Sequence, residues 1–169
     1  QSWKTAKAKK GSQSGRFARS EKTARECALA LLEFRDRTER ELRQKLKERE
    51  YGPEEIEETV LFLKEYRYLD DEAYADRYIR SCAARKSRRQ IRADLERKGV
   101  SREIIDLSFQ EEAVDEESQI EKLLLKKGYE PGKRMEPADY RRLMGTLGRR
   151  GFSSEAIRRV TDRMSEDAG

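Results

Sequence analysis

The chain has 169 residues and a formal net charge of +5, and 43% of its residues are charged against a usual share of about 25%. Only thin hydrophobic cores are possible in so charged a chain, which favours small units over one large domain. The sequence contains no His, no Gly-rich phosphate loop, no nucleophile elbow and no apolar run long enough to span a membrane. We therefore expect a cytoplasmic protein that is not an enzyme and binds no cofactor or metal.

Residues 1–22 are predicted to form a disordered basic arm. Between Gln1 and Ser20 the chain has six Lys or Arg and no acidic residue, with Gly and Ser between them. Such a segment cannot bury enough apolar surface to offset the entropy lost on folding.

The rest of the chain repeats one pattern: a small polar residue, an apolar residue four later, Leu four after that, then an aromatic residue or Val, then Ile. The copies are Thr38, Leu42, Leu46, Tyr51 and Ile56; Ser87, Ile91, Leu95, Val100 and Ile105; and Asp139, Leu143, Leu147, Phe152 and Ile157. A further amphipathic segment precedes each copy, and no segment alternates as a strand would. The sequence predicts an all-α fold, an elongated and curved tandem array of three three-helix repeats over residues 23–68, 69–110 and 111–169.

Helix caps and corners account for most of the repeated positions. The predicted N-caps are Thr38, Ser87 and Asp139 for the second helix of each unit, and Gly52, Ser101 and Ser153 for the third. Glu41 and Gln90 stand three residues after the first two caps, which is the capping-box spacing. Gly99 and Gly151 suit the left-handed residue that closes a helix, whereas the first unit has Glu50 at that corner.

Two connections and two cysteines complete the structural expectations. The stretch 109–119 contains no helix breaker, which is compatible with one long helix, whereas residues 130–137 contain two prolines and a glycine and are predicted as a loop. Cys27 and Cys82 lie on apolar helical stripes, so buried thiols are expected rather than a disulfide or metal ligands.

Charge is distributed in blocks along the chain. Residues 48–72 hold ten acidic and three basic residues, whereas residues 80–98 hold eight basic and two acidic. Arg88 and Arg89 directly follow the predicted Ser87 cap, where free N–H groups and guanidinium groups together suit a phosphate. This bipolar charge favours a protein that contacts both a polyanion and another protein.

A cation recurs at one position of all three units, as Arg40, Arg89 and Arg141. In the first unit Glu39 and Glu41 flank Arg40, so a solvated, ion-paired face explains it equally well there. In the second unit the excess of positive charge favours phosphate contact. The residues predicted to contact DNA or a partner are Arg85, Lys86, Arg88, Arg89, Arg92, Arg97, Lys98, Arg141, Arg142, Arg149 and Arg150.

Several stretches occur in a specific order. They are Arg-Asp-Arg-Thr-Glu-Arg-Glu-Leu at 35–42, Tyr-Leu-Asp-Asp-Glu-Ala-Tyr-Ala at 68–75, Arg-Arg-Gln-Ile-Arg-Ala-Asp-Leu-Glu-Arg-Lys-Gly-Val at 88–100 and Arg-Arg-Gly-Phe-Ser at 149–153. With these stretches the chain resembles the RecX family, bacterial regulators of the recombinase RecA, over residues 24–164. It departs from the family's expected Gly at Glu50, Arg67 and Ser87.

The resemblance implies a non-enzymatic negative regulator in DNA recombination, DNA repair and the SOS response. Such a protein binds in the groove of the RecA filament on single-stranded DNA and inhibits filament extension, ATP hydrolysis and strand exchange. The implied partners are the RecA filament, single-stranded DNA and, more weakly, duplex DNA, with no membrane, and the protein is expected to be a monomer. Two alternatives stay open: a free-standing DNA-binding module similar to a helix-turn-helix, and a helical protein-interaction scaffold.

Overall fold

The computed structural model describes residues 22–167, and the predicted basic arm lies outside the described residues except for Lys22. The described part contains nine helices and no strand, so the all-α prediction is confirmed. The helices are α1 (Ala24–Phe34), α2 (Glu39–Glu48), α3 (Pro53–Glu65), α4 (Asp71–Cys82), α5 (Arg88–Arg97), α6 (Arg102–Glu111), α7 (Glu116–Lys126), α8 (Pro137–Arg149) and α9 (Ser154–Glu166).

Three hydrophobic cores divide these helices into three units. The first unit (α1–α3) buries Leu42, Leu46 and Leu63, the second (α4–α6) buries Ile79, Ile91, Leu95 and Ile105, and the third (α7–α9) buries Ile120, Leu124, Leu147, Ile157 and Met164. The helix pairs that pack most closely all lie within single units. Because each fully buried aliphatic side chain contributes about 1.5–3 kcal/mol, each unit is stabilised mainly by its own core.

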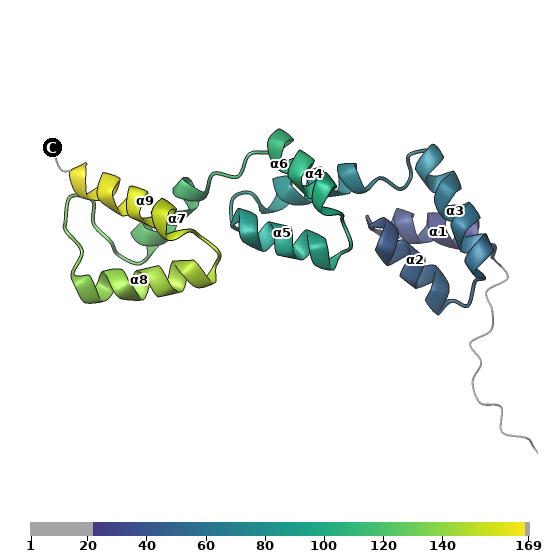
Figure 1. Ribbon diagram of the computed structural model, residues 1–169, viewed down its shortest axis with the longest axis horizontal. Coiled ribbons are helices and arrows are strands. Elements are labelled where there is room, and N and C mark those ends of the chain that lie inside the picture. Colours follow the sequence, from purple (N-terminus) through teal and green to yellow (C-terminus); the bar gives the residue numbers. More distant parts are fainter. Residues whose placement is uncertain (1–21, 168–169) are drawn as a thin grey trace, which may run out of the picture.

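The three units lie in one row along the long axis of the molecule, as Figure 1 shows. The second helices of the units, α2, α5 and α8, follow the same edge of this row, at the bottom of the view. The elongated tandem array of three-helix repeats is therefore confirmed, and its curvature stays a prediction.

Polar residues cap the helices at the repeated positions. Thr38 and Ser87 form complete capping boxes at the starts of α2 and α5. Gly52 is the N-cap of α3, with Pro at the first helical position. Ser101 and Ser153 cap α6 and α9, and each accepts a hydrogen bond from the third amide of its helix.

One predicted cap is wrong. α8 begins at Pro137, its N-cap is Glu136 without a side-chain capping bond, and Asp139 is the third residue of the helix. Proline lacks an N–H group and has a preset φ, so it suits the first helical position and moves the helix start ahead of Asp139. The Asp139 carboxylate still lies in the first turn, where the helix dipole favours a negative charge.

The helix corners share one backbone conformation. Gly99 and Gly151 have φ of 88° and 94°, and Glu50 at the first corner has φ of 63°. The left-handed conformation costs a side-chain-bearing residue about 1–2 kcal/mol. The first unit therefore keeps the corner of the other two without glycine.

The structure places the two connections between units more narrowly than the sequence does. The stretch 109–119 is not one helix, because Asp115 caps α7 by accepting a hydrogen bond from the Ser118 amide at 3.0 Å. Val114, just before this cap, packs in the second core, and Leu69 packs in the first. The predicted boundaries assign Leu69 to the second unit and Val114 to the third. Each side chain instead packs in the core of the unit before.

The loop before α8 and the two thiols agree with expectation. The chain between α7 and α8 has no regular structure, and the Gly132 amide donates to the Met164 carbonyl at 2.8 Å, which ties this loop to α9. Cys27 and Cys82 are free and buried.

Candidate nucleic-acid interface

The units meet through a polar contact that occurs twice. At the first junction the Thr38 hydroxyl donates to the Lys98 carbonyl at 2.5 Å, and at the second the Ser87 hydroxyl donates to the Arg150 carbonyl at 2.7 Å. Each hydroxyl also accepts the third amide of its own helix at 3.2 Å. A hydroxyl has one proton and two lone pairs, so it can do both. The cap of one unit therefore also holds the corner of the next.

A second contact at each junction uses the first amide of the capped helix. The Glu39 amide donates to Asp71 at 2.9 Å, and the Arg88 amide donates to Glu116 at 3.0 Å. Both carboxylates belong to the first residue of the next unit's first helix. The expectation of free N–H groups beside the arginines is therefore wrong for Arg88 and Gln90, whose amides are occupied. An anion near Arg88 would have to be held mainly by guanidinium groups.

Arginine packs against the corner glycine of the following unit. A Cβ on Gly99 would lie 2.6 Å from Arg40 Cβ, and a Cβ on Gly151 would lie 2.6 Å from Ser87 Oγ and 3.0 Å from Arg89 Cβ. The recurring cation thus has a packing role in the first two units. Arg141 holds the same repeat position in the third unit, after which the described chain has no further unit.

We expect Ser87→Ala to destabilise the protein more than the loss of a helix cap alone would. The cap contributes about 1 kcal/mol, and the partly buried bond to the Arg150 carbonyl adds about 1 kcal/mol. The matched control is Ser101→Ala, because Ser101 caps α6 and, among residues 22–167, makes no side-chain bond to another unit. Urea unfolding followed by circular dichroism should show that Ser87→Ala lowers the free energy of unfolding about twice as much as Ser101→Ala does. Equal losses would contradict a role of this hydroxyl in the junction.

The two junctions share geometry but differ in charge. At the first, Glu39 pairs with Lys64 at 3.1 Å and Arg43 at 3.6 Å, and Glu41 pairs with Lys98 at 3.5 Å. At the second, Arg88 and Gln90 replace these acids and the corner carries two arginines. We call the exposed residues around this second junction the arginine cluster: Arg85, Arg88, Arg89, Arg149 and Arg150. Within residues 22–167, none of the five forms an ion pair.

The other predicted contact residues are mostly paired. The ion pairs are Lys86 with Asp94 at 2.6 Å, Arg92 with Asp106 at 2.7 Å, Arg97 with Asp94, Lys98 with Glu41 at 3.5 Å and Arg142 with Asp139 at 3.7 Å. Arg141 is exposed and has no ion-pair partner in the described part of the chain. The structure thus separates cations that are already neutralised from those available to a polyanion.

Lys86 belongs to a small network inside the second unit. Asp94 accepts hydrogen bonds from Lys86 and from the Tyr78 hydroxyl, both at 2.6 Å. Burial and the bond to Asp94 raise the pKa of Tyr78 to about 12. Burial alone would raise the pKa of Asp94, but hydrogen bonds from Lys86 and Tyr78 outweigh it and lower that pKa. Lys86 therefore stabilises the second unit, and it is not available to a ligand while it is paired with Asp94.

An aromatic ring supports the arginines at the start of α5. The Arg88 and Arg92 guanidinium groups lie 5.1 and 5.5 Å from the centre of the buried Phe109 ring. Such cation–π contacts hold a guanidinium group in place without neutralising its charge. The sequence pattern marks Phe109 only as an apolar residue near the end of α6, so its role beside the arginines depends on the packing of α5 on α6.

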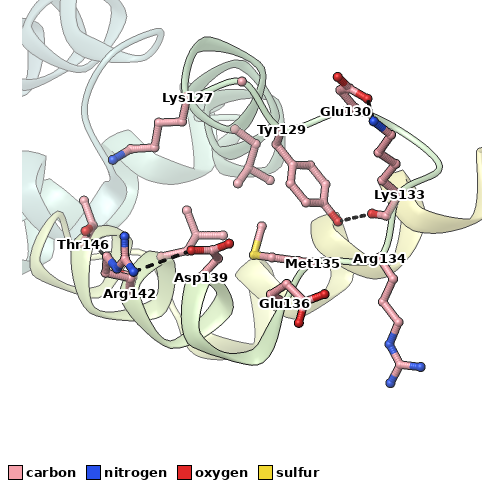
Figure 2. A pocket seen from close by; sticks show the side chains of 13 residues that line it. Lys127, Tyr129, Glu130, Lys133, Arg134, Met135, Glu136, Asp139, Arg142 and Thr146 are labelled. Atoms are coloured by element: carbon pink, nitrogen blue, oxygen red, sulfur yellow. Dashed lines mark hydrogen bonds and ion pairs between the residues drawn. The ribbon is translucent and has the colours of Figure 1, made fainter.

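A hollow of about 620 Å³ lies in the third unit, between the end of α7, the following loop and α8. Figure 2 shows Tyr129 and Met135 pointing into it, with Asp139 and Arg142 on the α8 side. Over residues 22–167 no cluster of acidic residues, His or Cys could hold a metal ion. No described helix is long and apolar enough to cross a membrane.

Models of the RecX family match the chain in order: the first three-helix domain over residues 24–63, the second over 70–107 and the third over 115–161. The chain belongs to the RecX family. Each RecX domain covers most of one core. Leu69, Phe109 and Val114 lie in the intervals between the domains, and Met164 lies after the third.

Known RecX proteins are similar over most of the chain. A regulatory protein RecX from Vibrio vulnificus is 35% identical over 144 residues, which are 85% of this chain and 94% of that protein. Another from Clostridium acetobutylicum is 34% identical over 98 residues, and the match spans 46% of its length. The crystal structure of RecX from Lactobacillus salivarius has a TM-score of 0.71 at 21% identity, covers 83% of this chain and 94% of that chain, and supports the fold.

Proposed function

We propose that this protein is a negative regulator of RecA that lies in the groove of the RecA filament on single-stranded DNA. There it would inhibit filament extension, ATP hydrolysis and strand exchange. Membership of a family whose relatives are named regulatory proteins supports the regulatory role. The observation that carries the nucleic-acid contact is the arginine cluster without ion-pair partners. A row of three units supplies an extended surface suited to a groove.

The arginine cluster suits phosphate groups for an energetic reason. A guanidinium group already paired with a carboxylate must break that pair before it binds a phosphate, whereas the cluster residues have no ion pair to break within the described part of the chain. Guanidinium groups bind phosphate through charge-assisted and often bidentate hydrogen bonds, and each neutralised phosphate releases counterions. We infer that the backbone of single-stranded DNA crosses the junction of the second and third units.

The acidic side of the first unit suits a different partner. Glu54, Glu58 and Glu65 follow one face of α3, are exposed and have no ion-pair partner within the described residues. Leu61 lies between them on the same face and is 59% exposed. We propose that this face meets a basic surface of RecA while the arginine cluster meets DNA, with one monomer making both contacts.

The decisive experiment is titration of the protein into RecA filaments while ATP hydrolysis and strand exchange are measured. A protein that hinders filament extension should inhibit well below one molecule per RecA, because one bound molecule stops growth for many subunits. No inhibition at equimolar protein would contradict the proposal. Sequence-selective duplex binding without RecA would favour a free-standing DNA-binding module, and RecA binding without DNA contact would favour a scaffold.

A further inference from the structure

We propose that the hollow of the third unit binds a nucleobase of single-stranded DNA. The proposal rests on the proposed DNA contact of the arginine cluster, and it adds a site that holds a base rather than a phosphate. Such a site would favour single strands, because bases in a duplex are stacked and paired.

The walls of the hollow suit a flat aromatic ligand. Tyr129 and Met135 of the loop, Leu124 of α7 and Leu143 of α8 give it apolar sides. The Tyr129 hydroxyl donates to the Lys133 carbonyl at 2.9 Å, which fixes the direction of its ring (Figure 2). A half-buried and fixed aromatic ring is the platform on which proteins stack the bases of single strands. The volume of about 620 Å³ lies in the range of about 300–1,000 Å³ usual for small-molecule sites.

α8 carries residues of both the hollow and the arginine cluster. Arg142 lines the hollow, and Arg149 of the cluster follows seven residues later on the same helix face. Seven residues of helix rise about 10 Å, so the two arginines are attached to α8 only about that far apart. A strand whose phosphates contact the cluster can therefore place a nearby base at the hollow.

The rim of the hollow suits a nucleotide better than an apolar protein side chain. Lys127 is exposed and has no ion-pair partner within residues 22–167, so it is available to a phosphate. The Glu136 carboxylate also lines the hollow and can accept hydrogen bonds from the exocyclic amino groups of bases. A purely apolar anchor would use neither group. Charge complementarity thus favours a base with its phosphate outside.

The test compares two single strands of equal length, oligodeoxycytidine and an abasic strand with the same phosphates. We expect the protein to bind the base-bearing strand about fivefold or more tightly, as one stacking contact allows. Tyr129→Leu should abolish this ratio without changing affinity for the abasic strand. Tyr129→Phe keeps the ring but loses the hydrogen bond to the Lys133 carbonyl, and it should retain most of this ratio. Circular dichroism checks that the third unit stays folded in both variants.

The outcomes separate this proposal from the one it rests on. If neither strand binds, the proposed DNA contact fails and the base site fails with it. If both bind equally well, the base site is overturned while the phosphate contact stands. If Tyr129→Leu keeps the ratio but loses RecA inhibition, the hollow holds a protein side chain and the base site is again overturned.

A second measurement does not depend on how the variants fold. The unaltered protein is irradiated with a strand carrying 5-iodouracil, which cross-links to aromatic side chains in contact with the base. We expect the adduct on the peptide containing Tyr129. Adducts found only elsewhere in the chain would overturn the proposal.

Discussion

Replacing Arg85, Arg88 and Arg149 together by Ala should weaken binding of single-stranded DNA by about tenfold or more and flatten its salt dependence. Each phosphate contact contributes about 0.7 to the slope of log affinity against log salt for a single strand. Losing three contacts should therefore reduce this slope by about 2. Arg89 is left in place because its side chain packs against Gly151 at the junction.

The matched control removes three cations that are already paired. Lys45 pairs with Glu48 at 3.4 Å, Arg77 with Asp36 at 2.8 Å and Arg80 with Glu112 at 3.3 Å. Their replacement by Ala changes the net charge by the same amount, and exposed pairs of this kind contribute little stability. Salt titrations of both variants separate local contact from total charge. If both variants lost the same affinity for single-stranded DNA, the proposed role of the arginine cluster in DNA binding would be wrong.

Replacing Gly99 or Gly151 by Ala should destabilise the array by about 2–3 kcal/mol. Part of this cost is the left-handed backbone, about 1–2 kcal/mol for any side chain. The rest arises because the new Cβ would lie 2.6 Å from Arg40 Cβ or from Ser87 Oγ, which displaces the junction and its hydrogen bond of about 1 kcal/mol. RecA inhibition should fall as well, since the junctions set how the units face one another.

Gly128 provides the control for the backbone effect. Its φ is 85°, close to that of the junction glycines, but a Cβ there would meet nothing within 4 Å. Gly128→Ala should therefore cost only the left-handed penalty of about 1–2 kcal/mol, without the displaced junction and its lost hydrogen bond. Thermal unfolding of the three variants measures the difference. Equal melting temperatures would show that the close approach between units does not affect stability.

Much of the fold could be predicted because its signals are local. A capping residue, the amide three positions later and the apolar residues that follow lie within two turns of one helix, so Thr38 and Ser87 could be identified from spacing alone. Asp139 has the same spacing, but the prediction failed because Pro137 offers a better helix start two residues earlier. The junction between α6 and α7 could not be placed from the sequence, since Val114 marks it by burial in the second core rather than by a breaker residue.

The candidate site could be predicted only in part. The excess of positive charge at the start of α5 is visible in the sequence, and it predicts Arg88 and Arg89 as contact residues. Which cations are free depends on partners distant in the chain. Arg92 is paired with Asp106 on α6, and Lys98 is paired with Glu41 of the first unit. Such pairs form through packing and leave no periodic signal in the sequence.

The sequence by itself determined the number of units, the helix corners and the charge of each segment, because caps, glycines and apolar spacing act over a few residues. Only the tertiary structure decided what the repeated polar positions do between units. The hydroxyls of Thr38 and Ser87 have one bond within their own helix and a second to a carbonyl about 60 residues away. The same packing brings Arg149 and Arg150 beside Arg88 and Arg89, since the corner of one unit docks on the cap of the unit before it.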